Sequence, residues 1–290
     1  MSLASTCRNY GQNETLISSI RNIIKGIPSK CGLKEWQGPA ILIFNNARFK
    51  ESDFESLMQI RVGGKQDDDT KIGKHGLGFN SCYHFTDVPS FISGDFIAFL
   101  DPQENYLNKR GTIGSLPRNG ISEFTEQDQL VPFKDIEGID FRSTFEGTLF
   151  RIPLRKKKSD ISDRIFSVDQ ILELFTKIKS SIPSQFLFLR NVETVEISQI
   201  SEATVPFQIK PLCKVTMEGL DETVRNKRKC ENITNDEFHI FQIKTKLIDN
   251  GDINNKQYNS WIIVIGAQRD PEDPELMQYA RRYRLRLLGG

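Results

Sequence analysis

The sequence predicts a mixed α/β protein in which short apolar strands alternate with amphipathic helices. Two observations support this fold class. Residues 40–44 (Ala-Ile-Leu-Ile-Phe) form a short apolar run after Gly38-Pro39, which is typical of a buried strand. Residues 168–180 carry apolar side chains at helical spacing. With 290 residues, 38% of them apolar, the chain is long enough for one large domain or two modest ones.

The N-terminal half is predicted to contain helices and strands around one long loop. Leu16, Ile20 and Ile24 recur at helical spacing, which predicts a helix over residues 14–26. Ser52 or Asp53 can cap a second helix after the strand at 40–44. Residues 61–75 are polar and contain glycine, and a loop of this length is uncommon unless it serves a function. The other expected elements are a helix from Asn80 to Phe85 and strands at 96–100 and 148–154, with irregular chain over 103–140.

The C-terminal half is predicted to be a helix followed by a strand-rich segment. Ile171, Phe175 and Ile178 mark the apolar face of the helix at 168–180. A strand pair is expected at 185–189 and 192–197. Further strands are expected near 206–216, 238–248 and 260–266, followed by a helix from Pro274 to about Tyr283. A boundary near residue 200 divides the chain into domains 1–200 and 201–290, the second being a smaller α/β subdomain.

Composition argues against several classes of function. The net charge of +1 gives no global electrostatic reason to expect nucleic acid or an acidic membrane as partner. The basic run from Arg155 to Lys158 is interpreted as a solvated strand end. The 5 cysteines are odd in number and form no C-x-x-C pair, which opposes a disulfide framework or zinc site. Because we identify neither a signal peptide nor a membrane-spanning run, we expect a cytoplasmic or nuclear protein.

A glycine pattern is the strongest local sign of chemistry. Gly73, Gly76 and Gly78 form G-x-x-G-x-G at the junction between the polar loop and the following helix. Glycine lets the backbone approach a ligand closely, and free N–H groups at a helix N-terminus attract phosphate. The pattern is neither a Walker loop, because no Gly-Lys-Ser/Thr occurs there, nor the dinucleotide fingerprint. A tight turn before a helix remains the structural alternative.

The surrounding sequence contains further motifs in a characteristic order. They are Glu35 to Phe49, Lys71 to Ser81, Thr86-Asp87-Val88-Pro89-Ser90, Leu100 to Gln103, and Glu146 to Arg155. In order and spacing they closely resemble the repeated N-terminal modules of sacsin-like proteins. Those modules are related to the Bergerat (GHKL) nucleotide-binding domain of the ninety-kilodalton heat-shock chaperone. The resemblance implies a two-layer α/β sandwich, with a mainly antiparallel mixed sheet and helices on one face.

The resemblance also implies an adenine site at two strand ends. In GHKL proteins an acidic residue after a strand binds the adenine amino group, and Asn45-Asn46 occupies that place here, with Asn46 the better match. An amide oxygen can accept the same hydrogen bond, but without charge, so weaker adenine binding is expected. Gly147-Thr148 resembles the box whose threonine hydroxyl contacts adenine directly or through water.

The phosphates are expected at the glycine pattern. The resemblance places Gly73, Gly76 and Gly78 around them, with Leu77 and Phe79 beside the last two glycines. Loop 61–75 would be the lid. Lys71 or Lys74 is a further candidate for phosphate contact, although a solvated loop lysine is the simpler interpretation of either. ATP or ADP is therefore the expected cofactor.

The family's catalytic helix has no counterpart in the sequence. That helix carries Glu-x-x-x-Asn, whose Glu activates water and whose Asn binds magnesium, and Asn22 has Ser18 four residues before it. Without both groups, phosphoryl transfer loses positioning and charge stabilisation. We therefore expect no catalytic residues, no secured Mg²⁺ site and no hydrolysis. The sequence is interpreted as a fragment or a degenerate module, N-terminally incomplete and C-terminally truncated.

Three functional hypotheses follow. The first is a chaperone-related module that binds adenine nucleotide and acts in protein folding or quality control, with seventy-kilodalton heat-shock chaperones and client proteins as partners. The second is a non-catalytic protein-interaction module on a degenerate GHKL fold. The third, a MutL-type repair protein or histidine kinase, is disfavoured by the Gly-Phe-Asn-Ser and Asp-Val-Pro-Ser context. A shared fold alone does not establish function.

Overall fold

The structure is a computed structural model of the 290-residue chain. It describes residues 14–21, 33, 36–50, 53–54, 77–107, 110–116, 130–185, 187, 189, 191–201, 208–229, 238–269 and 277–286. The strands are β1 (Glu14–Arg21), β2 (Ala40–Asn45), β3 (Ser90–Gly94), β4 (Phe96–Leu100), β5 (Gly111–Ser115), β6 (Phe145–Pro153), β7 (Val192–Ser201), β8 (Gln208–Glu218), β9 (Phe238–Asp249), β10 (Lys256–Arg269) and β11 (Met277–Arg286). The helices are α2 (Leu77–Asn80), η3 (Ser81–His84), η5 (Val131–Phe133), α4 (Val168–Lys179), α5 (Ile182–Gln185) and α6 (Glu222–Lys229).

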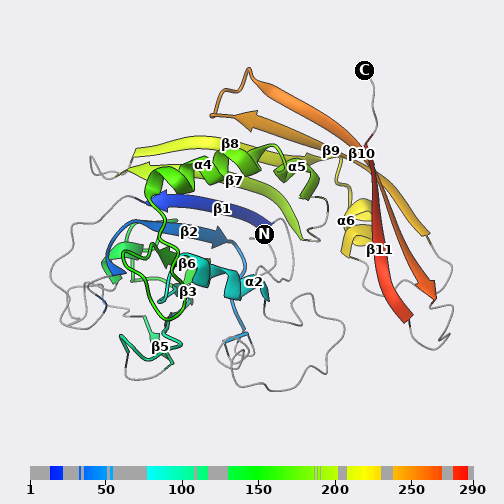
Figure 1. Ribbon diagram of the computed structural model, residues 1–290. Helices are drawn as coiled ribbons and strands as arrows, with labels where there is room; N and C mark the ends of the chain where they lie inside the picture. The colour runs from blue at the N-terminus through cyan, green and yellow to red at the C-terminus, as the bar shows by residue number, and fades with distance from the viewer. Residues whose placement is uncertain are drawn as a thin grey trace.

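The described strands join in one twisted sheet. Its order is β11-β10-β9-β8-β7-β1-β2-β6-β3-β4-β5 (Figure 1). Neighbouring strands are antiparallel except β1 and β7, which run parallel. The predicted class, an α+β fold with a mixed and mainly antiparallel sheet, is thereby confirmed. Its assignment to the Bergerat fold stays a prediction.

One face of the sheet carries a continuous apolar core beneath the helices. Alternate residues of β2 and β6, among them Ile43 and Phe150, point to this face and pack with Phe79 at α2 and Phe175 of α4. The same cluster extends through β8 and β9 to Trp261 of β10. Figure 1 shows α4 and α5 together on one side of the strands. Helices on this face are what the sandwich architecture requires.

The other face is covered locally by irregular chain. Leu42 of β2, Ile92 of β3 and Leu149 of β6 are fully buried there. The residues that cover them come from the segment around η5: Leu130, Phe133, Ile136, Ile139 and Phe141. The sheet is therefore buried on both faces around β2, β6 and β3, which explains the nearly unbroken apolar runs of these strands.

The predicted helix at 168–180 is confirmed as α4. Ser167 caps it, since its hydroxyl accepts from the N–H of Gln170 at 3.2 Å and the Gln170 side chain accepts from the Ser167 N–H at 2.9 Å. This reciprocal capping box satisfies two donors that helix formation leaves open. Its apolar face buries Ile171 and Phe175, as the spacing predicted.

Two predicted helices are wrong, because both segments are strands. Residues 14–21 form β1, which lies between β2 and β7 and hydrogen-bonds to both. Residues 277–286 form β11, which pairs along β10. In both segments the helical spacing competes with β-branched or aromatic residues that favour strands, and pairing with a neighbouring strand decides the outcome.

Several smaller expectations also need correction. Residues 185–189 are not a strand in their described part, because α5 reaches Gln185; its expected partner, 192–197, lies within β7. The helix expected at Asn80–Phe85 is a short α-helix that continues as the 3₁₀ turn η3. The segment 103–140, expected to be irregular, contains β5 and η5. Strand β3 and helix α6 were not predicted from the sequence.

The sheet and its core both cross the expected domain boundary near residue 200. Strand β7 ends at Ser201 and pairs with β8, so hydrogen bonds join the two sides. Val195 before the boundary and Val215 after it belong to the same buried cluster. The division of the chain into two domains, 1–200 and 201–290, stays a prediction.

Candidate functional site

The expected site residues are only partly within the described structure. Asn45, Asn46, Gly147 and Thr148 are described, as is the helical stretch Leu77–Phe79. Gly73, Gly76, Lys71 and Lys74, with the expected lid at 61–75, lie outside the described residues. The predicted phosphate contacts of this second group therefore stay predictions.

The two strand ends predicted to hold adenine lie side by side. Asn45, the last residue of β2, is directly opposite Thr148 of β6 in the antiparallel register. Both side chains are buried, with exposed fractions of 3% and 0%. They point to the helix-covered face, because each is two residues from a core side chain of that face, Ile43 and Phe150 respectively.

A chain of hydrogen bonds runs through Thr148. The N–H of Phe49 donates to Ser93 Oγ at 2.7 Å, and Ser93 Oγ lies 2.8 Å from Thr148 Oγ1. The Thr148 hydroxyl donates to the carbonyl of Ala47 at 2.7 Å. Because a hydroxyl has one proton, Ser93 must be the donor to Thr148. The Thr148 hydroxyl thus donates its only proton within the protein, and its oxygen retains one lone pair.

Asn45 and Asn46 differ in their surroundings. The side-chain oxygen of Asn45 accepts from the N–H of Ala47 at 2.9 Å, which turns the chain sharply after β2. Asn46 is exposed at the strand end. The structure therefore brings Asn45, rather than Asn46, next to Thr148.

Gly147 permits the close approach of β2 and β6. A Cβ at this position would lie 2.6 Å from the carbonyl oxygen of Asn45 and 2.6 Å from Cε2 of Phe44. Such distances are below normal contact, so any side chain here pushes the strands apart. The glycine of the Gly-Thr pair has a packing role on the face opposite to Thr148.

An aromatic cluster occupies the space between the strand ends and α2. Phe49 packs against Phe91 and Phe150, with ring centroids 5.3 and 5.8 Å apart. Phe54 stacks on Phe91 at 5.6 Å, and Phe79 lies 6.0 Å from Phe150. The start of α2 is thereby fixed on the same face as Asn45 and Thr148.

A rim ion pair flanks this region. Both Arg48 and Glu146 are exposed, and the guanidinium donates to both carboxylate oxygens, with Nε at 2.9 Å from Oε2. The hydrogen bond with Arg48 lowers the pKa of Glu146. Exposed pairs contribute little stability, so this pair serves mainly to orient the chain after β2.

A buried ion pair behind the site was missed by sequence reasoning. The Arg155 guanidinium contacts Asp87, with Nε 2.8 Å from Oδ1, and their side chains are 1% and 3% exposed. Arg155 also donates to the carbonyls of Tyr83 at 2.9 Å and His84 at 3.2 Å, at the end of η3. The interpretation of the run Arg155–Lys158 as a solvated strand end is thus wrong for Arg155, while the three lysines are exposed. Residue type alone gave no sign of this burial.

The described residues show neither a metal cluster nor an activated thiol. They contain no gathering of three or more side chains suited to hold a metal ion. Burial raises the pKa of the Cys82 thiol, and it raises that of Cys213 to about 11, so neither is an activated nucleophile. Within the described structure, every helix is too short or too polar to cross a membrane.

Comparison with known proteins identifies the family. A family model described as the sacsin domain matches residues 14–210, more than half of the chain. The chain belongs to the sacsin domain family. The resemblance drawn from the sequence motifs is thereby confirmed at the level of this family, whereas the relation to GHKL proteins stays a prediction.

The sacsin domain has a well-matched human relative. Sacsin of Homo sapiens is 37% identical over 169 residues, which cover 56% of this chain and 4% of that protein. The chain therefore spans a very small part of the relative's length. Among solved structures, one described as the N-terminal domain of a DNA repair protein matches at 8% identity with a TM-score of 0.29, covering 87% of this chain and 63% of that one. A match this weak carries no argument about fold or function.

Proposed function

We propose that this sacsin domain binds adenine nucleotide at the ends of β2 and β6, beneath α2, and does not hydrolyse it. The observation that carries the proposal is the pairing of Asn45 with Thr148 on the helix-covered face. These are two of the positions at which the family pattern expects adenine contacts. Helix α2, Leu77–Asn80, contains Gly78, the last glycine of the pattern. Phe79, the expected neighbour of the phosphates, packs on the same face of the sheet as Asn45 and Thr148, which supports the proposal.

The hydrogen-bond chain supports a specific mode of base recognition. Since Thr148 donates to Ala47, its remaining lone pair can only accept. An acceptor suits the exocyclic amino group of adenine and opposes the carbonyl that guanine carries at the same position. Neither Asn45 nor Asn46 has the charge of the acidic residue it replaces, so the affinity is expected to be weak.

The first experiment is a gain of function. Asn45→Asp and Asn46→Asp each restore a carboxylate at one of the two candidate positions. A charge-assisted hydrogen bond to the adenine amino group is expected to tighten ATP binding about ten-fold in the variant whose side chain touches the base. Equilibrium dialysis with ATP and GTP measures this. Unchanged ATP affinity in both variants, or equal gains for GTP, contradicts the adenine site.

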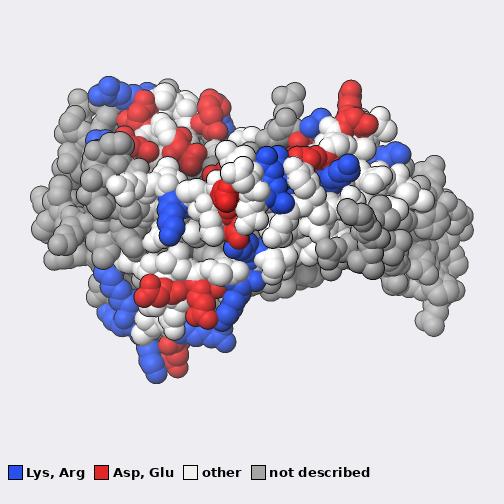
Figure 2. Space-filling view, turned by 90° about the horizontal axis from the view of Figure 1, so that it is seen from above, with Lys and Arg blue, Asp and Glu red and all other residues white. Residues whose placement is uncertain are grey.

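In its cellular role we propose that the domain forms part of a cytoplasmic or nuclear co-chaperone. Nucleotide-dependent contact with client proteins or seventy-kilodalton heat-shock chaperones would then regulate folding or quality control. This part of the proposal rests on the family alone. Figure 2 shows acidic and basic side chains interspersed over the described surface of one face. Such a surface gives no support to nucleic-acid binding there.

The alternative is a non-catalytic interaction module without nucleotide. It is favoured by the complete burial of Thr148 and by the phenylalanine cluster packed around Phe49. Under this alternative the hydrogen bonds through Ser93 and Thr148 serve only to hold the segment after β2 against the sheet. The two hypotheses differ in one prediction. Only the nucleotide-binding hypothesis predicts that added nucleotide changes the environment of Thr148.

A further inference from the structure

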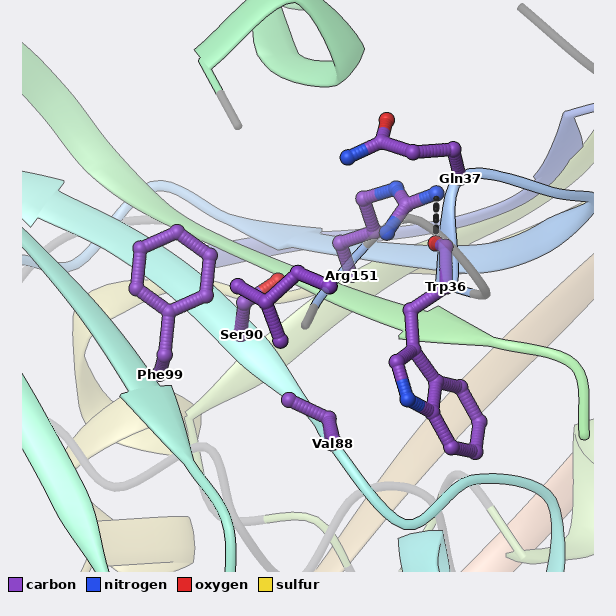
Figure 3. A pocket seen from close by; sticks show the side chains of 7 residues that line it. Trp36, Gln37, Val88, Ser90, Phe99 and Arg151 are labelled. Atoms are coloured by element: carbon purple, nitrogen blue, oxygen red, sulfur yellow. Dashed lines mark hydrogen bonds between the residues drawn. The ribbon is translucent and has the colours of Figure 1, made fainter. Parts of the chain in front are cut away.

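Two buried arginines lie on β6 and just after it, and they reach different partners. Arg151 Nη2 donates to the carbonyl of Trp36 at 2.9 Å, beside a cavity with room for about one water, which is too little for a ligand (Figure 3). Arg155 instead pairs with the buried carboxylate of Asp87, and that carboxylate also accepts from the hydroxyl of Ser159 at 2.9 Å. Ser159 is partly exposed, so the buried pair is linked to a side chain at the surface.

Ser159 follows a run of basic residues. Lys156, Lys157 and Lys158 directly precede it, and all three are exposed. They lie in the segment 154–167, which joins β6 to α4 without helix or strand. One class of protein kinase has an acidic substrate groove that binds basic residues before the target serine. The run therefore has the composition and the exposure of a kinase recognition sequence.

The hydrogen bonds of Ser159 are mostly local. Apart from its bond to Asp87, its oxygen accepts from the N–H groups of Ile161 at 3.3 Å and Ser162 at 3.4 Å, which are long for hydrogen bonds. Its own N–H donates to the carbonyl of Ser162 at 3.2 Å, within the same turn. The residues on either side, 156–158 and 163–165, are exposed. A local opening that presents Ser159 to an enzyme therefore breaks the link to Asp87 and leaves the sheet intact.

A phosphate on Ser159 is incompatible with this link. The phosphorylated oxygen has no proton to donate, and the phosphate adds a charge of about −1.5 to −2 beside a carboxylate that is 3% exposed. Arg155 cannot follow the phosphate outward, because its guanidinium also donates to the carbonyls of Tyr83 at 2.9 Å and Thr86 at 3.2 Å. The phosphorylated segment must then leave Asp87, and the exposed lysines before Ser159 compensate the charge of the phosphate.

We propose that Ser159 is phosphorylated by a protein kinase that selects basic residues, and that the phosphate releases the segment 156–166 from Asp87. The Ser159 oxygen attacks the γ-phosphorus of ATP bound to the kinase. A bond forms between that oxygen and the phosphorus, the bond to ADP breaks, and the hydroxyl proton passes to the catalytic base of the kinase. This ATP is held by the kinase, so the proposal is independent of nucleotide binding by the sacsin domain itself.

The first test is phosphorylation of the full chain with Mg²⁺, ATP and the catalytic subunit of cyclic-AMP-dependent protein kinase, a kinase with this preference. Fragmentation mass spectrometry locates the phosphate. Ser162 is the internal control, because it is also partly buried in the same segment but lacks lysines directly before it. A chain with both Lys156→Gln and Lys157→Gln is expected to be phosphorylated at Ser159 about ten-fold more slowly, because charge-assisted contacts with the kinase are lost.

Hydrogen exchange measured by mass spectrometry then tests the release of the segment. The amides of 156–166 are expected to exchange about ten-fold faster in the phosphorylated chain, while those inside α4 stay unchanged as reference. Ser159→Ala removes the hydroxyl without adding charge, so it is expected to give a smaller increase.

Phosphate at Ser159 that depends on the lysines, with faster exchange in 156–166, supports the proposal. Phosphorylation of Ser162 at the same rate, an unchanged rate in the lysine variant, or no phosphate at Ser159 overturns the modification site. Equal exchange in the phosphorylated and the unmodified chain overturns the release from Asp87.

Discussion

Gly147 shows at the residue scale how a motif residue can be required by packing. Gly147→Ala places a Cβ 2.6 Å from the Asn45 carbonyl oxygen, so β2 and β6 must separate. We expect a loss of about 1–3 kcal/mol in the free energy of unfolding, measured by urea denaturation. Gly114→Ala in β5 is the matched control, because a Cβ there meets nothing within 4 Å. Equal losses for both variants would contradict the packing role.

The buried pair of Asp87 and Arg155 supports a second prediction. Arg155→Met leaves the Asp87 carboxylate buried with the Ser159 hydroxyl, 2.9 Å away, as its remaining side-chain partner. Breaking a buried pair in this way is expected to cost about 3–5 kcal/mol. Arg110→Met removes a pair of similar chemistry whose side chains are 66% and 48% exposed, and should cost less than about 1 kcal/mol. The prediction fails if the chemical denaturation midpoints of the two variants coincide.

Asp140 gives the protein a predictable response to acid. Its Oδ1 accepts from the backbone N–H groups of Arg142 at 2.9 Å and Ser143 at 3.0 Å, and from the Ser143 hydroxyl at 3.0 Å. These bonds lower the pKa of Asp140 to about 2. The unfolded value is about 3.9, so the stabilisation is complete above that pH and is lost as the pH falls through the folded value.

Asp140→Asn should therefore flatten the pH dependence of stability below about pH 4. The measurement is the urea midpoint of the wild type and the variant across this acidic range. At neutral pH the wild type should be the more stable of the two, and the difference should shrink as the pH falls. A constant difference would show that the carboxylate charge is not involved.

At the scale of elements, β1 is the strand that joins the two halves of the sheet. Ile17 is paired with Phe44 of β2 on one side and Glu196 of β7 on the other. A proline at this position removes a ladder donor in a central strand. Ile17→Pro should cost at least about 2 kcal/mol, through the lost hydrogen bond and the carbonyl it leaves unsatisfied.

Ile113→Pro in the edge strand β5 is the control, since edge strands tolerate proline. Thermal unfolding followed by circular dichroism compares the two variants. If Ile113→Pro is the more damaging, β1 does not have the central position described.

The elements also show why sequence predicted some structure and missed the rest. Helix α4 was predictable because its amphipathic spacing and its capping residue Ser167 agree with each other. Strand β1 was not, because the helical spacing of Leu16 and Ile20 is a local signal, while two partner strands distant in sequence decide the conformation. Strand β11 was not predicted for the same reason, because its conformation depends on pairing with β10.

The candidate site residues come from short motifs, and their role stays a prediction. The motifs named Asn45, Asn46 and Thr148 and favoured Asn46 over Asn45, whereas the register places Asn45 opposite Thr148. Ser93 was missed as a site residue, because only the pairing of β3 with β6 shows that it lies opposite Thr148. Asp87 and Arg155 each belong to a quoted motif, yet their mutual burial is visible only in three dimensions.

For the whole molecule, the sheet positions two chemically different regions on its opposite faces. The helix-covered face holds Asn45 and Thr148 near α2, and the other face is covered by the apolar segment around η5.

Calorimetric titration of the folded chain with ATP and ADP, with and without magnesium, tests the proposed adenine-nucleotide site. Gly76→Asp is the control, because a carboxylate in the glycine pattern repels the phosphates. We expect weak binding that depends little on magnesium, that Gly76→Asp abolishes, and that is not followed by release of phosphate. Absence of binding at millimolar nucleotide, or equal binding by Gly76→Asp, would contradict it and favour the interaction module without nucleotide.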